Sequence, residues 1–352
     1  MIASTLPVQQ EAFVRQAAFA EPLPGGRVRC HLCAFRCRIE PGRRGICGVR
    51  ENRAGALHTL VYGRAVADEI DPIEKKPFHH FLPGSTAYSI ATVGCNFRCL
   101  HCQNHAIALF PREHGGRLMG RALSPEEVVL LARRNGCGSV AYTYTEPTVF
   151  FEYAQRTAAL AAAAGLRNVF VTNGTATPEA LQALAPVLHG VNIDLKSFSD
   201  RFYRRICGGA RLHWVLDAIG LHRRLGIWVE VTTLVIPGRN DSEAELRDIA
   251  RFLVGVDRNI PWHVSRFFPA HRMAEVPPTP LATLERAREV GFEEGLRHVY
   301  LGNLRPGETG EDTVCPGCSV AVIRRRGHHV LANTLRDGAC PHCGHAIAGV
   351  WR

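Results

Sequence analysis

The chain has 352 residues, of which 46% are hydrophobic, so it can bury a large core and still carry smaller modules beside one main domain. Its net charge is +10, but basic pairs such as Arg133-Arg134 are scattered, so a nucleic-acid partner is disfavoured although it stays open. The first twenty residues contain Glu11 and Arg15 and do not resemble a signal peptide, and no apolar run is long enough to span a membrane. We therefore expect a cytoplasmic protein with no membrane partner. The thirteen cysteines are an odd number, so we expect metal-bound thiolates and not a disulfide framework.

The first distinctive element is a group of four cysteines, which we call the N-terminal cysteine group. Its members follow the spacing Cys-x2-Cys-x3-Cys-x9-Cys and are Cys30, Cys33, Cys37 and Cys47. Four thiolates can close a zinc site or hold an iron–sulfur cluster, and the spacing does not choose between the two. We assign the group to a small cysteine-rich module over residues 1–60.

A charged segment, DPIEKKPFHHFLPGS at 71–85, comes next. Its titratable side chains include Asp71, Glu74, Lys75, His79 and His80. Their density suggests a role in substrate binding or gating, whereas composition alone describes a solvated loop.

Short β-branched runs then alternate with helical segments. The predicted strands are 86–93, 138–144, 167–173, 190–196, 226–235, 260–267 and 297–302. Ser124 as N-cap, Pro125 at the first helical position and Gly136 as a stop delimit one of the helices. The alternation predicts an α/β fold over residues 61–305, a complete or partial (β/α) barrel whose reacting groups lie at the carboxyl ends of its strands.

The loop after the first of these strands is GCNFRCLHCQNH, residues 94–105, which we call the three-cysteine loop. Cys95, Cys99 and Cys102 are spaced Cys-x3-Cys-x2-Cys. Three thiolates suit a cubane iron–sulfur cluster whose fourth iron stays open to another ligand. The alternatives are a zinc site completed by His101 or His105, or three reduced cysteines of the core.

This loop after a first strand resembles the radical S-adenosylmethionine (radical SAM) superfamily. A closer resemblance, to the radical SAM enzymes of the AmmeMemoRadiSam system and hence to the pyruvate formate-lyase activating enzyme, covers nearly the whole chain. It is carried by residues 30–52, 71–85, 95–104, 142–153, 192–198, 235–242 and 266–273 and by the paired CPxC motifs. The resemblance implies a [4Fe–4S] cluster whose open iron binds S-adenosylmethionine (SAM). It also implies an oxidoreductase that cleaves SAM to methionine and a 5′-deoxyadenosyl radical, which takes hydrogen from an unidentified substrate.

The resemblance also implies residues that contact SAM. Glu146, in TYTEPTV, matches the position that accepts hydrogen bonds from the methionyl ammonium, although it could instead stabilise the helix that begins at Pro147. His101 stands where an aromatic carbocycle commonly contacts adenine. Further candidates at strand ends are Asn173, Asp194 and Lys196. Alternation puts Asp194 and Lys196 on one face, where Lys196 could pair with the methionyl carboxylate or simply form a surface ion pair.

The last group, which we call the C-terminal cysteine group, has two CPxC motifs 21 residues apart. Its members are Cys315, Cys318, Cys340 and Cys343. The spacing is typical of a zinc ribbon, with rubredoxin-like iron as the second choice, and we assign it to a module over residues 306–352. Cys137 and Cys207 have no partners in the sequence, so we expect them to be small buried apolar residues.

The expected partners follow from the resemblance. A low-potential donor such as flavodoxin or ferredoxin would supply the electron, and a protein substrate is possible in principle, with Memo-like and AMMECR1-like proteins as associates that the family name implies. The competing hypothesis is a zinc-ribbon RNA-binding or RNA-modifying protein, suggested by the basic charge and the CPxC pairs.

Overall fold

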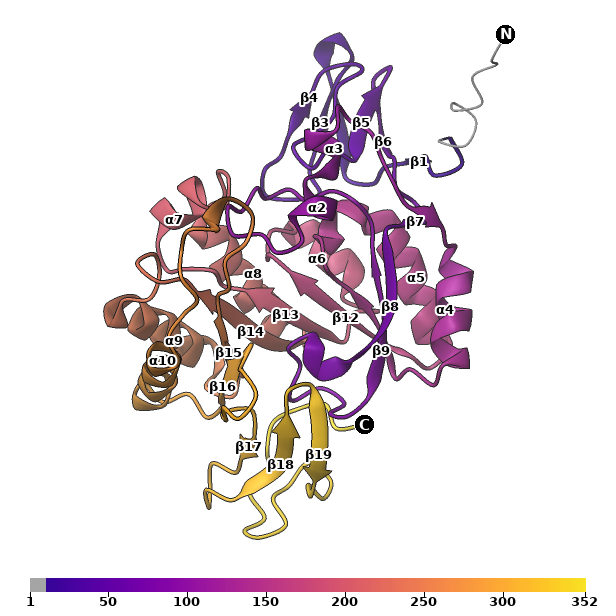
Figure 1. Cartoon of the computed structure of the whole chain (residues 1–352). Coiled ribbons are helices and arrows are strands. Elements are labelled where there is room, and N and C mark those ends of the chain that lie inside the picture. The colour runs from indigo at the N-terminus through magenta and orange to yellow at the C-terminus, as the bar shows by residue number, and fades with distance from the viewer. Residues whose placement is uncertain (1–10) are drawn as a thin grey trace. The chain divides into compact units, whose positions relative to one another are not determined.

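The structure is a computed structural model that describes residues 11–352 (Figure 1). Residues 1–10, which belong to the predicted N-terminal module, lie outside this range. The chain forms two compact units. The first comprises the described residues up to Ile70 together with Tyr88–Arg98 and Asn104–Leu188, and the second comprises Asp71–Ala87, Cys99–Gln103 and His189–Arg352. Within residues 11–352 no helix is long and apolar enough to cross a membrane.

The N-terminal part of the first unit consists of small antiparallel sheets. One sheet has the order β2-β3-β4 and contains β2 (Ala20–Leu23), β3 (Arg27–Cys30) and β4 (Arg38–Ile39), with η1 (Pro24–Gly26) between its first two strands. The others contain β1 (Arg15–Gln16), β6 (Ala56–Thr59) and β5 (Arg50–Arg53), and the pair β7 (Arg64–Ala65) and β10 (Arg121–Ala122). Cys30 ends β3, and Cys33, Cys37 and Cys47 lie in the segments that connect these short strands.

The rest of the first unit has α/β architecture. Its strands lie in the order β12-β11-β9-β8 and are β8 (Ala67–Pro72), β9 (Thr86–Ala91), β11 (Ser139–Tyr142) and β12 (Arg167–Thr172). Its helices are α2 (His105–Ala108), α3 (Phe110–Glu113), α4 (Pro125–Arg134), η3 (Pro147–Phe150), α5 (Phe151–Ala163) and α6 (Pro178–Leu184). β11 and β12 run parallel, and every residue of β11 is buried, as a sheet covered on both faces requires. The predicted start of α4 is confirmed, because Ser124 and Glu127 form a capping box.

The second unit repeats this architecture. Its parallel strands follow one another in chain order and are β13 (Gly190–Asp194), β14 (Trp228–Val235), β15 (Trp262–Arg266) and β16 (Val299–Gly302). Its helices are η2 (Ile73–Lys75), α7 (Asp200–Arg205), α8 (Leu212–Arg224), α9 (Glu243–Asp257), η4 (His271–Met273) and α10 (Leu281–Glu293). An antiparallel sheet of order β17-β18-β19 follows, made of β17 (Thr313–Val314), β18 (Ala321–Arg326) and β19 (His329–Asn333), and drawn in yellow tones in Figure 1.

Segment 71–85 is largely buried, so the solvated loop that its composition describes is wrong. Its anchor is Glu230 of β14, which is fully buried and accepts hydrogen bonds from the backbone N–H groups of His79 and His80, both at 2.9 Å. The ring of His263 lies 2.7 Å from the same carboxylate. Glu230 and His263 lie in the amino-terminal halves of their strands. In parallel α/β sheets, ligands bind at the carboxyl ends of the strands. The segment therefore serves the packing of the second unit.

The same segment binds the last residues of the second unit. The backbone N–H of Leu82 donates to the Val350 carbonyl and that of Val350 donates to the His80 carbonyl, both at 2.7 Å. Arg325 of β18 donates from Nη2 to the His79 carbonyl at 2.7 Å. Burial lowers the pKa of His80 well below its ordinary value, so its ring is neutral where Nδ1 donates to the Ala348 carbonyl. Backbone bonds thus join the 71–85 segment to Val350, and the Arg325 side chain joins it to the antiparallel sheet.

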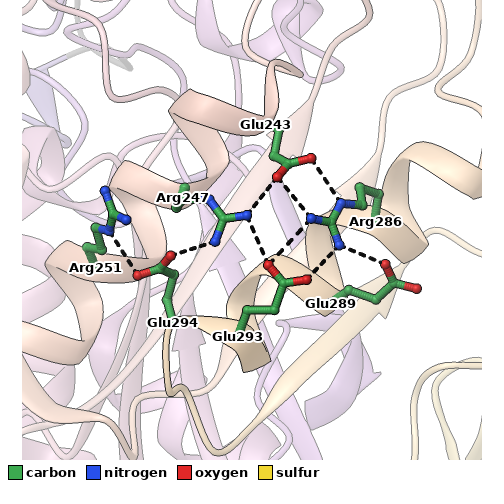
Figure 2. Close-up of polar contacts among 7 residues, drawn as sticks. All are labelled: Glu243, Arg247, Arg251, Arg286, Glu289, Glu293 and Glu294. Atoms are coloured by element: carbon green, nitrogen blue, oxygen red, sulfur yellow. Dashed lines mark hydrogen bonds and ion pairs between the residues drawn. The ribbon is translucent and has the colours of Figure 1, made fainter.

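Helices α9 and α10 are joined by a network of ion pairs (Figure 2). Its members are Glu243, Arg247, Arg251, Arg286, Glu289, Glu293 and Glu294. Arg286 contacts carboxylates on both helices, and its hydrogen bonds, followed by those of Arg247, lower the pKa of Glu243 to about 2. Because that pKa is depressed from 4.5, the pairing stabilises the fold above pH 4.5 and is lost as the pH falls through about 2.

We expect Arg286→Met to lower the melting temperature by at most about 3 °C, because exposed ion pairs contribute little even in a network. The decrease should shrink in high salt, since screening weakens the wild-type pairs too. Arg133→Met, at an exposed position of α4, serves as the control and should leave the melting temperature unchanged. Calorimetry at low and high salt checks both variants, and a decrease that does not depend on salt would show that Arg286 acts through packing.

Candidate functional site

The three-cysteine loop begins at the carboxyl end of β9, where Gly94 has a positive φ of 99°. A Cβ at this position would lie 2.7 Å from Cγ1 of Val49 and 2.9 Å from the Cys47 carbonyl oxygen. Only glycine fits such a close approach. Cys95 follows directly and belongs to the first unit, whereas Cys99 and Cys102 belong to the second.

In the first unit, Asn96 closes a ring of hydrogen bonds with two residues that follow β12. Asn96 Nδ2 donates to Thr175 Oγ1 at 2.8 Å, Thr175 Oγ1 donates to Asn173 Oδ1 at 2.6 Å, and Asn173 Nδ2 donates to Asn96 Oδ1 at 2.7 Å. All three side chains are buried. The ring holds the start of the three-cysteine loop against the end of β12. Asn173 was a predicted site residue, while Asn96 and Thr175 were missed, although a buried amide between two cluster cysteines was the available signal.

Glu146 is buried at the carboxyl end of β11 and is hydrogen-bonded from several sides. Its Oε1 accepts from the Thr148 N–H, the Thr148 hydroxyl and the Thr172 hydroxyl at 3.0, 2.6 and 2.8 Å, and its Oε2 accepts from the Asn173 N–H at 2.8 Å. Burial raises the pKa of Glu146, and these hydrogen bonds oppose the rise. The carboxylate therefore ties β11 to β12 and starts η3, and Oε2, with a single hydrogen bond, has capacity for another donor.

The turn between β11 and η3 is strained. Tyr144 lies in the left-handed region with φ 62°, which a non-glycine residue rarely adopts. The Tyr144 carbonyl accepts from Asn104 Nδ2 at 2.8 Å, and the Thr145 hydroxyl donates to the Thr92 carbonyl at 2.9 Å. The turn is thus held by Thr92, just before the three-cysteine loop, and by Asn104, near its end. These two bonds join the carboxyl ends of β9 and β11.

In the second unit, Asp194 ends β13 and Lys196 follows it, and the two side chains meet on one face as alternation predicts. Lys196 Nζ lies 2.7 Å from Asp194 Oδ2, and the lysine side chain is only 15% exposed. Burial opposes the charge of Lys196, but Asp194 and the neighbouring Cys99 hold its pKa well above the ordinary value. A lysine cation and an aspartate anion therefore lie together at the carboxyl end of β13.

Residues 99–103 are held in the second unit by two backbone bonds to Leu100. Its N–H donates to the Ile206 carbonyl at 2.9 Å, and its carbonyl accepts from the Arg272 N–H at 2.9 Å. Cys207 is buried, as expected, and it is also a hydrogen-bond neighbour of the Cys99 thiol, which together with burial raises the pKa of Cys99. The structure thus gives Cys207 a role next to a predicted ligand, which the sequence spacing could not show.

His101 is buried in the same stretch and carries no charge at neutral pH. Burial, and secondarily the charge of Lys196, lowers its pKa to about 3. Its ring centroid lies 6.1 Å from that of Phe202, and its Nδ1 has no hydrogen-bond partner within residues 11–352. A neutral aromatic ring with one unsatisfied polar atom remains compatible with a bound ligand on this side.

The thirteen cysteines all lie within residues 11–352, and none forms a disulfide. The C-terminal cysteine group is compact, because its sulfur atoms lie within 4.8 Å of one another. Sγ of Cys315 is 3.6 Å from that of Cys343, and Sγ of Cys318 is 3.6 Å from that of Cys340. A tetrahedral zinc ion with Zn–S bonds of about 2.3 Å requires sulfur separations of about 3.8 Å, so the group fits one such ion.

The N-terminal cysteine group has a different arrangement. Cys30, Cys33 and Cys47 are buried and Cys37 is half-buried, and all four line one cavity of the first unit. Within residues 11–352, the C-terminal cysteine group is the set of metal-ligand side chains whose ligand atoms all lie within 4.8 Å of one another. The sulfur atoms of the N-terminal cysteine group are therefore spaced more widely than those of the C-terminal cysteine group.

Comparison with known proteins gives the chain a family. The model of the Radical SAM superfamily matches residues 89–253, which include the three-cysteine loop. An uncharacterized protein of Methanocaldococcus jannaschii is 44% identical over 337 residues, covering 95% of this chain and 99% of that protein. A GTP 3′,8-cyclase of Stenotrophomonas maltophilia is 28% identical over 158 residues, covering 43% of this chain and 46% of the cyclase.

A solved structure supports the fold. The crystal structure of Streptococcus suis SuiB bound to S-adenosylmethionine has a TM-score of 0.50 at 14% identity, and the match covers 66% of this chain and 53% of SuiB. At that identity the likeness concerns the α/β fold with its mostly parallel strands. The residues that the family model matches, 89–253, include Cys95, Cys99 and Cys102 of the three-cysteine loop. This chain is therefore a radical SAM enzyme and belongs to the radical SAM superfamily.

Proposed function

We propose that this enzyme cleaves SAM reductively and that the resulting 5′-deoxyadenosyl radical abstracts hydrogen from a separate substrate. The observation that carries the proposal is the three-cysteine loop, which offers three thiolates where an iron–sulfur cubane needs four ligands. Cys95, Cys99 and Cys102 would hold the cluster, and the cluster would supply the electron that cleaves SAM.

Asp194 and Lys196 are suited to the methionyl group of SAM. That group has an ammonium and a carboxylate, and the pair offers one partner of each sign. Lys196 keeps its charge at neutral pH because Asp194 and Cys99 raise its pKa, so it can meet the carboxylate in the ionised state. The neutral ring of His101 offers an uncharged surface to the adenine. Glu146, which holds the first unit's strand ends together, remains the predicted contact of the ammonium, and Asn173 remains a predicted SAM contact.

The finer assignment rests on the sequence motifs. We place the enzyme in the AmmeMemoRadiSam system, with the complete or partial (β/α) barrel of the activating enzymes, and infer that it modifies a partner protein. Memo-like and AMMECR1-like proteins are the candidate partners that the system's name supplies. A flavodoxin or a ferredoxin is the proposed electron donor, since SAM cleavage needs one low-potential electron.

We also propose that the C-terminal cysteine group binds zinc as a ribbon-like module. The sulfur separations of 3.6 Å support a single tetrahedral ion. The small core beside it consists of Cys315, Val322, Ile323, Cys340 and Ile347, with Cys318, Val330, Leu335 and Trp351 partly buried against it. So small a core gives little stability alone, and a metal ion would supply much of the module's folding free energy.

The central test is whether anaerobically reconstituted protein makes 5′-deoxyadenosine from SAM with a low-potential reductant. We expect product with the wild type and only background with Cys99→Ala, because the cluster loses a ligand. Cys137→Ala removes a buried thiol outside the loop and should keep the activity. Chromatography of the quenched reactions gives the yields. Wild-type protein with a full complement of iron and sulfide but no 5′-deoxyadenosine would rule the proposal out.

The proposed role of Lys196 predicts that Lys196→Met weakens SAM binding about 10- to 100-fold, the usual loss for a hydrogen bond to a charged group. Lys196→Arg keeps the charge and should recover much of the affinity. Equilibrium binding of SAM to the oxidised protein measures the effect without turnover. Equal affinity of Lys196→Met and wild type would mean that Lys196 only pairs with Asp194.

The zinc assignment predicts that Cys318→Ser loses about one zinc ion per chain, because a structural site is closed by four ligands. Hydrogen exchange should then accelerate across β18 and β19. His342→Ala, at an exposed position of the second CPxC motif, should keep the metal. Elemental analysis decides between the metals, and a loss of iron in place of zinc would indicate a rubredoxin-like site.

A further inference from the structure

The N-terminal cysteine group surrounds a hollow in the first unit that the proposed reaction does not use. The cavity is lined by the four cysteines together with Leu32, Ile39, Gly45, Ile46, Arg50, Thr148 and Val149. Apart from the thiols, Thr148 and Arg50, the wall is apolar or backbone. Four thiols that face one such space are the donor set of a thiolate-bound metal centre.

The spacing of these thiols argues for a centre larger than one ion. The C-terminal cysteine group has all four sulfurs within 4.8 Å, as a single tetrahedral ion requires, and the N-terminal cysteine group does not meet this spacing although the same cavity holds its four members. In a cubane each thiolate binds a different iron, so the sulfurs stand farther apart than around one ion. The wider sulfur spacing of the N-terminal cysteine group thus favours an iron–sulfur cluster, and the tighter spacing of the C-terminal cysteine group favours a single zinc ion.

Arg50 supplies an independent indication of an anionic occupant. Its side chain is only 2% exposed, its Nη1 donates to Glu152 Oε1 at 2.8 Å, and its Nη2 donates to the Ala18 carbonyl. Its Nε is buried and has no hydrogen-bond partner within residues 11–352, and Arg50 lines the cysteine cavity. A buried N–H without an acceptor is rare. Thiolate or sulfide sulfur of a negatively charged cluster would be the acceptor that it lacks.

The cavity adjoins the start of the three-cysteine loop. Gly94 packs on the Cys47 carbonyl, whose oxygen would lie only 2.9 Å from a Cβ at this position. Phe97 contacts Phe35, with ring centroids 6.3 Å apart. Arg112 donates from Nη2 to the Cys95 carbonyl at 3.4 Å, and its Nη1 is buried without a partner in the described part of the chain. One guanidinium and one glycine contact therefore link the surroundings of Cys47 and Cys95.

We propose that Cys30, Cys33, Cys37 and Cys47 bind a second [4Fe–4S] cluster in the first unit, next to the start of the three-cysteine loop. A flavodoxin- or ferredoxin-class donor gives up one electron, the second cluster takes it on going from the 2+ to the 1+ state, and it returns to 2+ when it reduces the cluster of the three-cysteine loop. The electron transfer from the second cluster to the three-cysteine loop rests on the proposed function. The binding of a second cluster by the N-terminal cysteine group does not.

The test counts iron, sulfide and zinc in full-length, anaerobically reconstituted protein. The variant Cys95→Ala/Cys99→Ala/Cys102→Ala leaves the N-terminal cysteine group intact and should retain about four irons and four sulfides per chain. After reduction it should give the electron paramagnetic resonance signal of a [4Fe–4S] cluster, unchanged by added SAM. A triple variant that reconstitutes no iron, or that carries zinc at the N-terminal site, would overturn the proposal.

The converse variant, Cys30→Ser/Cys33→Ser, should lose about four irons, while Cys318→Ser should lose none. If the converse variant does not fold, the triple variant alone still decides the question. These metal counts do not depend on turnover, so a failure of the wild type to make 5′-deoxyadenosine would contradict the proposed function and leave the second cluster standing.

Arg112 tests the location of the cluster. Removing a cation from beside an iron–sulfur cluster disfavours the more negative reduced state, so Arg112→Met in the triple variant should lower the cluster's reduction potential. Arg117→Met, at an exposed position of the same segment, should leave it unchanged. A redox titration followed by electron paramagnetic resonance measures both, and an unaltered potential in Arg112→Met would place the cluster away from Cys95.

Discussion

The first unit depends on the closed ring of hydrogen bonds among Asn96, Asn173 and Thr175. Each of these side chains is buried, and each finds its partners in the other two, so removing any one leaves unpaired polar atoms in a low-dielectric interior. The ring also has neighbours on a third side. The Thr175 carbonyl accepts from the Ala34 N–H at 2.9 Å, and Asn96 is a hydrogen-bond neighbour of Cys33. The start of the three-cysteine loop, the end of β12 and the N-terminal cysteine group are therefore positioned by the same few atoms.

The second unit solves a similar problem with charge. Lys196 lies at a strand end where burial would favour its neutral form, and Asp194 keeps it ionised at a fixed place. At the other end of the strands, Glu230 is paired with backbone N–H groups and the His263 ring. The Asp194 side chain is 34% exposed and leaves a charged lysine beside it, which suits the ligand contact proposed above. Glu230 is fully buried and uses its oxygens for hydrogen bonds within the chain.

Sequence reasoning succeeded where the information is local. β-branched runs became the strands, Ser124 caps α4, and residues two apart on an extended segment placed Asp194 beside Lys196. The CPxC spacing indicated the compact C-terminal site, because two cysteines separated by two residues in one tight turn cannot lie far apart.

Reasoning failed where the partner is distant in sequence. Segment 71–85 is polar by composition, and its burial depends on Glu230, about 150 residues away. Cys207 acquired a neighbour in Cys99 only through the bond from Leu100 to Ile206. Spacing also left the N-terminal cysteine group undecided, since it does not report how far apart the four sulfurs lie.

The bonds between residues 80–82 and residues 348–350 have a consequence for synthesis on the ribosome. Segment 71–85 emerges early, yet its backbone is completed by β14 and then by Val350, so it must wait for most of the chain to be translated. During that interval the exposed Phe78 and Phe81, both fully buried in the finished protein, present a surface that chaperones bind. The first unit ends at Leu188, so all of its residues, the N-terminal cysteine group included, have been synthesised long before Val350 is added.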